Sequence, residues 1–210
     1  MKLYYSTGSC SMSCHIALEE AGLTYTGVEA SWDRNENIQE IEKLNPLGVV
    51  PVFVNDQGKV LTQNAAILEY IADAKPDSRL LADKGTWERV ETASWLSFVA
   101  ADFHKAFGPL FMASQMATSP DAQNEIKVFT REKIKGYLEY LNTNLAGKDY
   151  LTGKTFTIAD AYLFTVLGWC KWLEVPTSGF ANVTSYMKRV LARPAVQKVV
   201  TIHDMASEYV

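Results

Sequence analysis

Short apolar segments alternate with amphipathic ones along the first 75 residues or so. Alternating or short apolar runs predict strands at residues 2–6, 25–29, 52–54 and 59–61. The last two strands flank an Asn-Asp-Gln-Gly turn that is typical of a hairpin. Apolar residues at helical spacing predict helices at residues 11–21, 37–44 and 64–74. The predicted order β-α-β-α-β-β-α indicates a small α/β unit.

After a polar stretch that contains a proline, only helical periodicity follows. It predicts helices within residues 86–116, 121–145, 157–173, 180–191 and 194–202. The segment 157–173 is apolar on all sides, which is typical of a buried central helix. We therefore expect an α/β domain over residues 1–76, a linker over 77–85 and an α-helical domain over 86–210.

Composition narrows the class of protein. Hydrophobic residues make up 48% and charged residues 21% of the 210 residues, which is ordinary for a globular chain and excludes a disordered one. The net charge of −4 and the lack of a basic stripe argue against nucleic-acid binding. We expect no membrane span and no signal peptide, because no apolar run is long enough. Three cysteines cannot form a disulfide scaffold, so a reducing, cytoplasmic location is expected.

A cysteine stands where the first predicted strand gives way to a helix. Free backbone N–H groups and the helix dipole favour a thiolate there, so Cys10 is predicted to be an activated thiol with a lowered pKa. The alternative is a small buried cysteine. Cys14 follows one turn later and is predicted to fill the core. Together with His15 these thiols lack an evident fourth ligand, so no metal site is expected.

Two further segments carry candidate ligand contacts. Pro51 directly precedes a predicted strand, and a cis Val50–Pro51 bond would turn the Val50 backbone outward beside Cys10; the alternative is an ordinary trans proline. Asn64 suits a helix N-cap, and the helix start could bind a carboxylate, with Gln63 and Asn64 holding the charged end of a small peptide. Capping alone is the alternative interpretation.

The helical half holds a polar stripe and a folding signal. Ser97, Ala101, His104 and Gly108 fall on one face of a regular helix, which could line a cleft, although a lone histidine can also be structural. Thr157 and Asp160 have the spacing of a capping box at the start of the apolar helix. Four aromatic residues are candidates either for an apolar ligand pocket or for the core: Phe107, Phe111, Trp169 and Trp172.

Several segments, taken in order, resemble the cytosolic glutathione S-transferases, most closely the bacterial beta class. Residues 1–13 resemble the start of that class, and residues 45–51 read Asn-Pro-Leu-Gly-Val-Val-Pro, similar to the family's NPxGxVP segment. Residues 70–73 resemble the third helix of the family, 103–111 its long helix and 156–164 its capped core helix. The resemblance covers nearly the whole chain.

The resemblance implies a thioredoxin-like domain followed by a helical domain, a homodimer, and glutathione as co-substrate with no metal. It implies a cytoplasmic glutathione transferase that acts on a hydrophobic electrophile in detoxification. Cys10 and His104 would be the catalytic residues. The resemblance extends glutathione contacts to Tyr5, Ser9, Cys10, Ser11, Arg34, Asn35, Val50, Pro51, Gln63, Asn64, Ser97, Ala101, Asp102, Phe103, His104 and Lys105.

Some positions depart from the family pattern. Gln63 and Asn64 stand where the beta class usually has glutamate followed by serine or glycine, so a formal negative charge is lost. Arg34 would take the place of a usual lysine, Cys14 that of a proline and Ser97 that of an asparagine. The charge loss is expected to weaken glutathione binding, because charge-assisted hydrogen bonds are stronger than neutral ones.

Two other functions remain open at this point. One is a glutaredoxin-like thiol-disulfide reductase with Cys10 as its sole nucleophile, since no C-x-x-C pair is present. The other is a non-catalytic protein of the same fold that binds ligands or partner proteins, which the missing acid at Gln63 favours.

Overall fold

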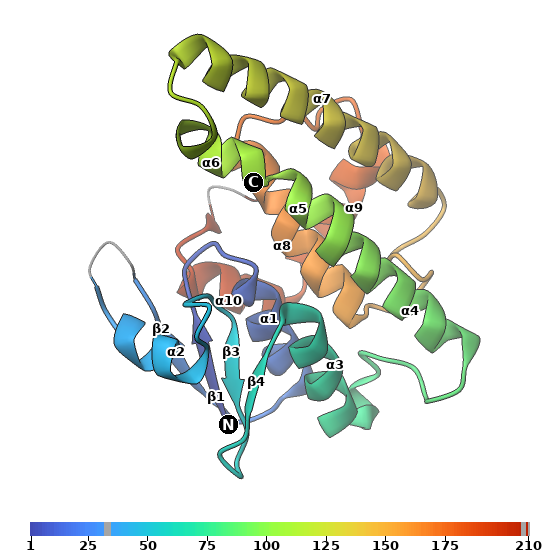
Figure 1. Ribbon diagram of the computed structural model, residues 1–210. Helices are drawn as coiled ribbons and strands as arrows, with labels where there is room; N and C mark the ends of the chain where they lie inside the picture. The colour runs from blue at the N-terminus through green and yellow to red at the C-terminus, as the bar shows by residue number, and fades with distance from the viewer. Residues whose placement is uncertain (32–34, 207–208, 210) are drawn as a thin grey trace.

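The computed structural model describes residues 1–31, 35–206 and 209 (Figure 1). Its first part contains the strands β1 (Lys2–Tyr5), β2 (Thr26–Glu29), β3 (Val52–Val54) and β4 (Val60–Thr62), and the helices α1 (Ser11–Ala21), α2 (Ile38–Leu44) and α3 (Asn64–Ala74). The second part contains η1 (Pro76–Ser78), α4 (Trp87–Phe98), η2 (Val99–Phe103), α5 (His104–Ala106), α6 (Gly108–Met116), α7 (Pro120–Asn144), α8 (Ile158–Trp172), α9 (Ala181–Leu191) and α10 (Pro194–Ile202).

The strands form one mixed sheet in the order β2-β1-β3-β4, as expected for a thioredoxin-like unit. β1 pairs in parallel with β2 and antiparallel with β3, and β3 pairs antiparallel with β4. The predicted hairpin is confirmed. Its turn is held by the Asn55 side chain, whose Oδ1 accepts hydrogen bonds from the backbone N–H groups of Gln57 and Lys59. The predicted β-α-β-α-β-β-α order is therefore correct.

Alternation along the strands gives each face of the sheet its own core. Leu3 and Phe53 belong to the large core shared with α1 and α3. Tyr4 and Val52 belong to a smaller cluster that α2 completes with Ile38 and other residues. Side chains of successive strand residues point to opposite faces, so one strand serves both cores. Helix α2 thus covers the face opposite to α1 and α3 (Figure 1).

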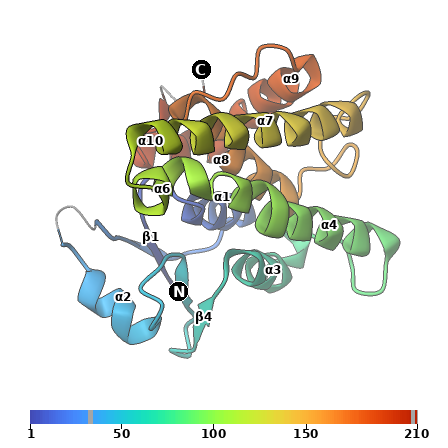
Figure 2. The same cartoon turned by 45° about the horizontal axis from the view of Figure 1, so that its top comes forward.

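Helix α1 joins the sheet to the helical layer. It packs against β1 and α3 on one side and against α8 and α10 on the other. In both views α7 lies on the far side of the helical layer from the sheet (Figures 1 and 2). The connecting segment is anchored as well: Leu80 and Leu81 are buried, and the Leu80 carbonyl accepts a hydrogen bond from Ile158 N. The expected division at residues 76 and 86 stays a prediction, since one core runs through both parts.

The segment 86–116 is not the regular helix that its periodicity predicts. A π-helical stretch, η2, follows α4, and the short α5 leads into α6, whose second residue is Pro109. A π-turn holds more residues than an α-turn, and therefore rotates the residues after it relative to those before it. The face that carries His104 consequently differs from the predicted stripe, as the site shows below.

Helix α8 is the buried central helix that the sequence predicts. Thr157 caps it, and Asp160 completes the predicted capping box by accepting hydrogen bonds from the backbone N–H and the hydroxyl of Thr157. Asp160 also accepts from Leu151 N and from the Tyr186 hydroxyl, so its carboxylate ties three segments together. No helix in the described part of the chain is long and apolar enough to span a membrane.

Candidate functional site

A pocket of about 350 Å³ opens between the sheet unit and the helical layer. Five segments surround it: the start of α1, the turn before β3, the start of α3, the η2–α5 region and α8. Its lining consists of Cys10, Asn45, Val49, Val50, Pro51, Gln63, Asn64, Ala65, Ala100, His104, Lys105 and Tyr162. Seven of these residues are among the glutathione contacts expected from the sequence: Cys10, Val50, Pro51, Gln63, Asn64, His104 and Lys105.

Cys10 is the residue immediately before α1, and its thiol reaches toward the Val50 carbonyl, 3.9 Å away. Burial raises the pKa of this thiol to about 11, while backbone hydrogen bonds of Cys10 and Ser11 and the charge of Lys105 lower it. The expectation of a lowered pKa is therefore wrong. The helix start does favour the thiolate, but loss of hydration outweighs that effect.

The Val50–Pro51 peptide bond is cis, so the alternative of an ordinary trans proline is excluded. The Asn45 side chain holds this turn by two hydrogen bonds. Its side-chain nitrogen donates to the Val49 carbonyl at 2.8 Å, and its side-chain oxygen accepts from Leu47 N at 3.2 Å. The Asn-Pro-Leu-Gly segment thus fixes the backbone that leads into Val50, where the pocket begins.

The start of α3 differs from the expected capping arrangement. Gln63, not Asn64, is the residue before the helix, and its φ of 73° lies in the left-handed region. The Asn64 side chain makes no capping hydrogen bond. It turns inward, where its nitrogen donates to Ser13 Oγ at 2.8 Å and its oxygen accepts from the Cys14 thiol at 3.1 Å. The Asn64 amide bonds to buried polar groups of α1 and not to the backbone at the start of α3. The Gln63 side chain and the backbone N–H groups of the first α3 turn are therefore available to a ligand.

Cys14 is fully buried, as predicted for a core cysteine, although its hydrogen bond to Asn64 gives it a polar contact too. The three clustered α1 side chains point to different partners: Cys10 to Val50, Cys14 to Asn64, and His15 to His203 at 3.1 Å. Among the described residues, no group of three metal-ligating side chains comes together.

His104 reaches the pocket from the helical layer. Its Nδ1 lies 2.6 Å from the Tyr162 hydroxyl, and its ring stands edge-on to Trp169 with the centroids 4.7 Å apart. Burial lowers the pKa of His104 to about 4, and Lys105 adds to the effect. The imidazole is therefore neutral at physiological pH, and one of its two nitrogens carries a proton.

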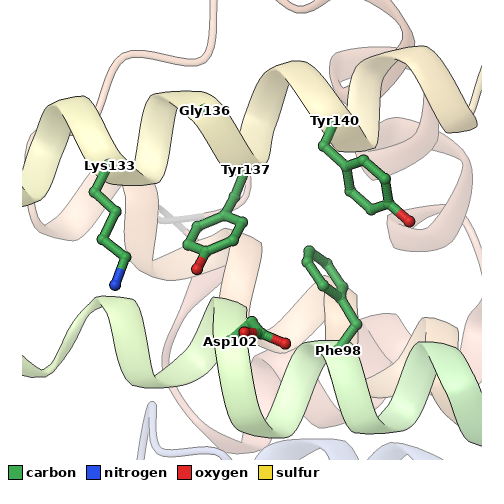
Figure 3. Close-up of a pocket in the computed structure, with 6 residues that line it drawn as sticks. All are labelled: Phe98, Asp102, Lys133, Gly136, Tyr137 and Tyr140. Atoms are coloured by element: carbon green, nitrogen blue, oxygen red, sulfur yellow. The ribbon is translucent and has the colours of Figure 1, made fainter.

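The remaining long-helix residues expected at the site do not line this pocket. Ala100 takes the place of Ala101 beside His104, because the π-turn rotates the chain between them. Ser97 and Ala101 are exposed, and Phe103 is fully buried in the core. Asp102 lines a different pocket between α4, η2 and α7. Figure 3 shows Asp102 on the helix that faces Lys133 and Tyr137 of α7.

Four residues from the sheet unit are also placed away from the pocket. Tyr5 packs against His15 and His203 on the other side of α1, with ring centroids 5.1 and 4.8 Å away. Ser9 and Ser11 hydrogen-bond each other at 2.5 Å beside the turn after β1. Asn35 is not part of the lining either. Arg34 lies outside the described residues.

Five lining residues were missed by the sequence reasoning: Asn45, Val49, Ala65, Ala100 and Tyr162. Asn45 and Val49 belong to the segment that resembled the family motif, and Ala65 adjoins the expected Gln63 and Asn64, so their neighbours gave a signal. Ala100 stands four residues before His104, so ordinary helical spacing was a signal for it. Tyr162 sat in a helix interpreted as wholly structural, and a hydroxyl on an otherwise apolar helix was its one sign.

Comparison with known proteins agrees with this geometry. The N-terminal domain family of glutathione S-transferases matches residues 1–73, and the C-terminal domain family matches residues 99–194. Glutathione S-transferase GstA of Escherichia coli O157:H7 is 38% identical over 98% of this chain and 100% of its own length. Glutathione S-transferase GST-4.5 of Xanthomonas campestris is 37% identical over 94% of this chain and 96% of its own length.

Solved structures give the same result. A sphingomonad glutathione S-transferase complexed with glutathione superposes with a TM-score of 0.88 at 36% identity, over 98% of this chain and all of the other. A beta-class glutathione S-transferase from Sphingomonas chungbukensis also reaches 0.88, at 37% identity and the same coverage. The expected fold, a thioredoxin-like unit followed by a helical one, is confirmed, and the chain belongs to the glutathione S-transferase family.

Proposed function

We propose that this transferase binds glutathione in the Cys10 pocket and transfers its thiolate to a hydrophobic electrophile. One observation carries the proposal: a single pocket unites the Cys10 thiol, the Val50 backbone before a cis proline, and the start of α3 at Gln63. An extended tripeptide needs such a row of contacts, namely polar groups for its charged ends and a backbone edge for its middle. The related sphingomonad structure is described as a complex with glutathione.

In this arrangement the cysteinyl backbone of glutathione pairs with Val50, and its sulfur lies beside Cys10. The γ-glutamyl end meets Gln63 and the free N–H groups of the first α3 turn, which favour a carboxylate. Lys105 lowers the pKa of the Cys10 thiol, and a positive charge there favours a bound thiolate for the same reason. The thiolate then attacks the electrophilic carbon, a carbon–sulfur bond forms, and the leaving group departs with the displaced electron pair.

An apolar electrophile fits the aromatic residues that lead away from His104. Trp169 is buried edge-on to His104, and Phe111 stands edge-on to both Trp169 and Trp172. Phe111 and Trp172 are 43% and 53% exposed, whereas Phe107 is fully buried in the core. Exposed aromatic side chains beside a polar pocket are typical of a binding surface, so we assign the electrophile to this side.

The experiment compares two variants that each add a phenyl ring, one at a residue that lines the pocket and one at the next residue, which does not. Ala100→Phe places a ring in the pocket, so it should abolish glutathione binding by calorimetry and conjugation of a chromogenic electrophile. Ala101→Phe, on the exposed side, should reduce binding far less. A larger loss with Ala101→Phe would contradict this site. Binding without any turnover over a panel of electrophiles would favour the non-catalytic alternative.

Thiol-disulfide exchange is a second candidate for the same pocket. Of the three cysteines, Cys10 lines the pocket, whereas Cys14 and Cys170 are buried and do not line it. This placement of one thiol in the pocket favours the exchange reaction. A thiol beside bound glutathione can form a mixed disulfide with it.

We also propose that the protein is a cytoplasmic homodimer. All three cysteines are free thiols, as a reducing compartment would keep them. Large apolar side chains are exposed on α4 and α7, among them Trp87, Val90 and Phe129, which are 76%, 57% and 74% exposed. Such a face suits a second copy of the chain. Sedimentation at micromolar concentration should give a dimer, and a monomer alone would contradict the proposal.

A further inference from the structure

Tyr162 and His104 form a contact that joins α8 to the start of α5 in the lining of the Cys10 pocket. The Tyr162 hydroxyl lies 2.6 Å from His104 Nδ1, and both residues line the pocket. The other ring nitrogen of His104, Nε2, has no hydrogen-bond partner among the described residues and is not among the buried unpaired atoms. The direction of the 2.6 Å hydrogen bond therefore decides what His104 offers to a ligand.

The chemistry of the two groups sets that direction. The nitrogen Nδ1 of a neutral imidazole is either the donor or the acceptor of such a bond. A phenolic O–H is a stronger acid than the N–H of a neutral imidazole, and an imidazole nitrogen is a better acceptor than a phenolic oxygen.

Since the phenol of Tyr162 is the stronger acid, its proton is donated to His104 Nδ1 at 2.6 Å. Because Tyr162 donates to Nδ1, the ring proton must lie on Nε2. The hydrogen bond from Tyr162 thus selects one defined tautomer of His104.

We propose that Tyr162 is a positioning residue of the active site, which holds His104 in the tautomer that presents an Nε2–H group to the sulfur of bound glutathione. This inference rests on the proposed glutathione site and adds a residue to it. An N–H group directed at a sulfur that becomes a thiolate stabilises the negative charge. The other tautomer would present a lone pair there and repel it.

The test is Tyr162→Phe, which removes the hydroxyl and retains the ring. We expect kcat for conjugation to fall about tenfold, the order of one hydrogen bond, with little change in the dissociation constant of glutathione. Nitrogen NMR of histidine-labelled protein should show His104 protonated on Nε2 in the wild type and a mixture of tautomers in the variant. Tyr140→Phe is the matched control, because Tyr140 is half exposed on α7 and does not line the Cys10 pocket.

A double-mutant cycle separates positioning from packing. In a His104→Ala background, Tyr162→Phe should have no further effect on kcat, because its role acts through His104. Equal losses in both backgrounds, or a wild-type tautomer with the proton on Nδ1, would overturn the inference while leaving the glutathione site intact. Failure of the wild type to bind glutathione would instead refute the proposed function, which calorimetry on the same sample shows directly.

Discussion

The indole Nε1 of Trp169 donates a hydrogen bond to the carbonyl oxygen of Gly8 at 2.8 Å, across 161 residues of sequence. Gly8 lies in the turn between β1 and Cys10, and Trp169 lies in the buried helix α8. The helical layer therefore holds the turn that places the Cys10 thiol. The same Trp169 ring packs edge-on against His104, so one side chain positions both residues expected to act in catalysis.

Trp169→Phe should destabilise the protein and loosen the site. The change leaves the buried Gly8 carbonyl without its donor, which costs about 1–3 kcal/mol in the free energy of unfolding. Urea denaturation measures the loss, and calorimetry should show weaker glutathione binding. Trp172→Phe is the control, since Trp172 is 53% exposed on the same helix and should change stability by less than about 0.5 kcal/mol. Equal effects of the two variants would refute a special role for the Gly8 contact.

Gln63→Glu should tighten glutathione binding. Gln63 lines the pocket at the start of α3, and a carboxylate there would meet the ammonium of the γ-glutamyl end in a charge-assisted hydrogen bond. The expected gain is about 1 kcal/mol by calorimetry. Gln57→Glu, on the exposed β3–β4 turn, adds the same charge outside the pocket and should change nothing. Weaker binding in Gln63→Glu would mean that the carboxylate end of the ligand lies there instead.

Cys10→Ala should separate the two candidate reactions. Thiol-disulfide reduction needs Cys10 as nucleophile and should be lost entirely, because no other cysteine lines the pocket. Conjugation should survive in part, since glutathione supplies its own sulfur. Paired assays with a disulfide and an electrophile measure both rates.

Mass spectrometry of the wild type provides the control for this assignment. Incubation with glutathione disulfide should place one glutathione on Cys10 and none on the buried Cys14 or Cys170. The raised pKa of the Cys10 thiol, about 11, predicts slow labelling at neutral pH that accelerates as the pH rises. Labelling of Cys14 or Cys170 alone would show that the site is wrongly assigned.

Stability should fall as the pH decreases from about 6.5 toward 4. Burial lowers the pKa of His15 and His104 to about 4 and that of His203 to about 3, from an ordinary value of 6.5. In this window the unfolded chain binds protons that the folded protein does not, so stability is fully present above pH 6.5 and is lost below it. Each unit of difference in pKa corresponds to about 1.4 kcal/mol.

Asp160 opposes this trend in part, because burial raises its pKa to about 6 and the folded protein takes up a proton there. Three histidines outweigh one carboxyl group, so the net stability should decrease. Urea denaturation at pH 7.5 and pH 5 measures the change. In His203→Phe, which removes the histidine whose Nδ1 is buried without a partner, the difference between the two pH values should be smaller. A wild-type stability that is equal at both pH values would contradict the assignment.

The order of strands and helices follows from the sequence because it depends on local periodicity. The Asn55–Gly58 turn, the short apolar segment at residues 2–6 and the Thr157–Asp160 capping box are patterns among near neighbours in the sequence. The hairpin, the first strand and the capped helix each appear in the structure as expected. The thiol at the helix start and the proline before β3 were recognisable for the same reason.

Only the tertiary structure decides the chemical state of these groups and which ones face the ligand. The pKa of Cys10 depends mainly on burial by segments far along the chain. The position of a thiol at a helix start does not reveal that burial. The choice of Ala100 over Ala101 depends on a π-turn that periodicity does not reveal. The Asn64 side chain does not cap its helix but hydrogen-bonds Ser13 and Cys14, about 50 residues earlier. Tyr162 hydrogen-bonds His104 from another helix. Such contacts arise when distant segments are packed together, so their energies are fixed by the fold and not by any local stretch of sequence.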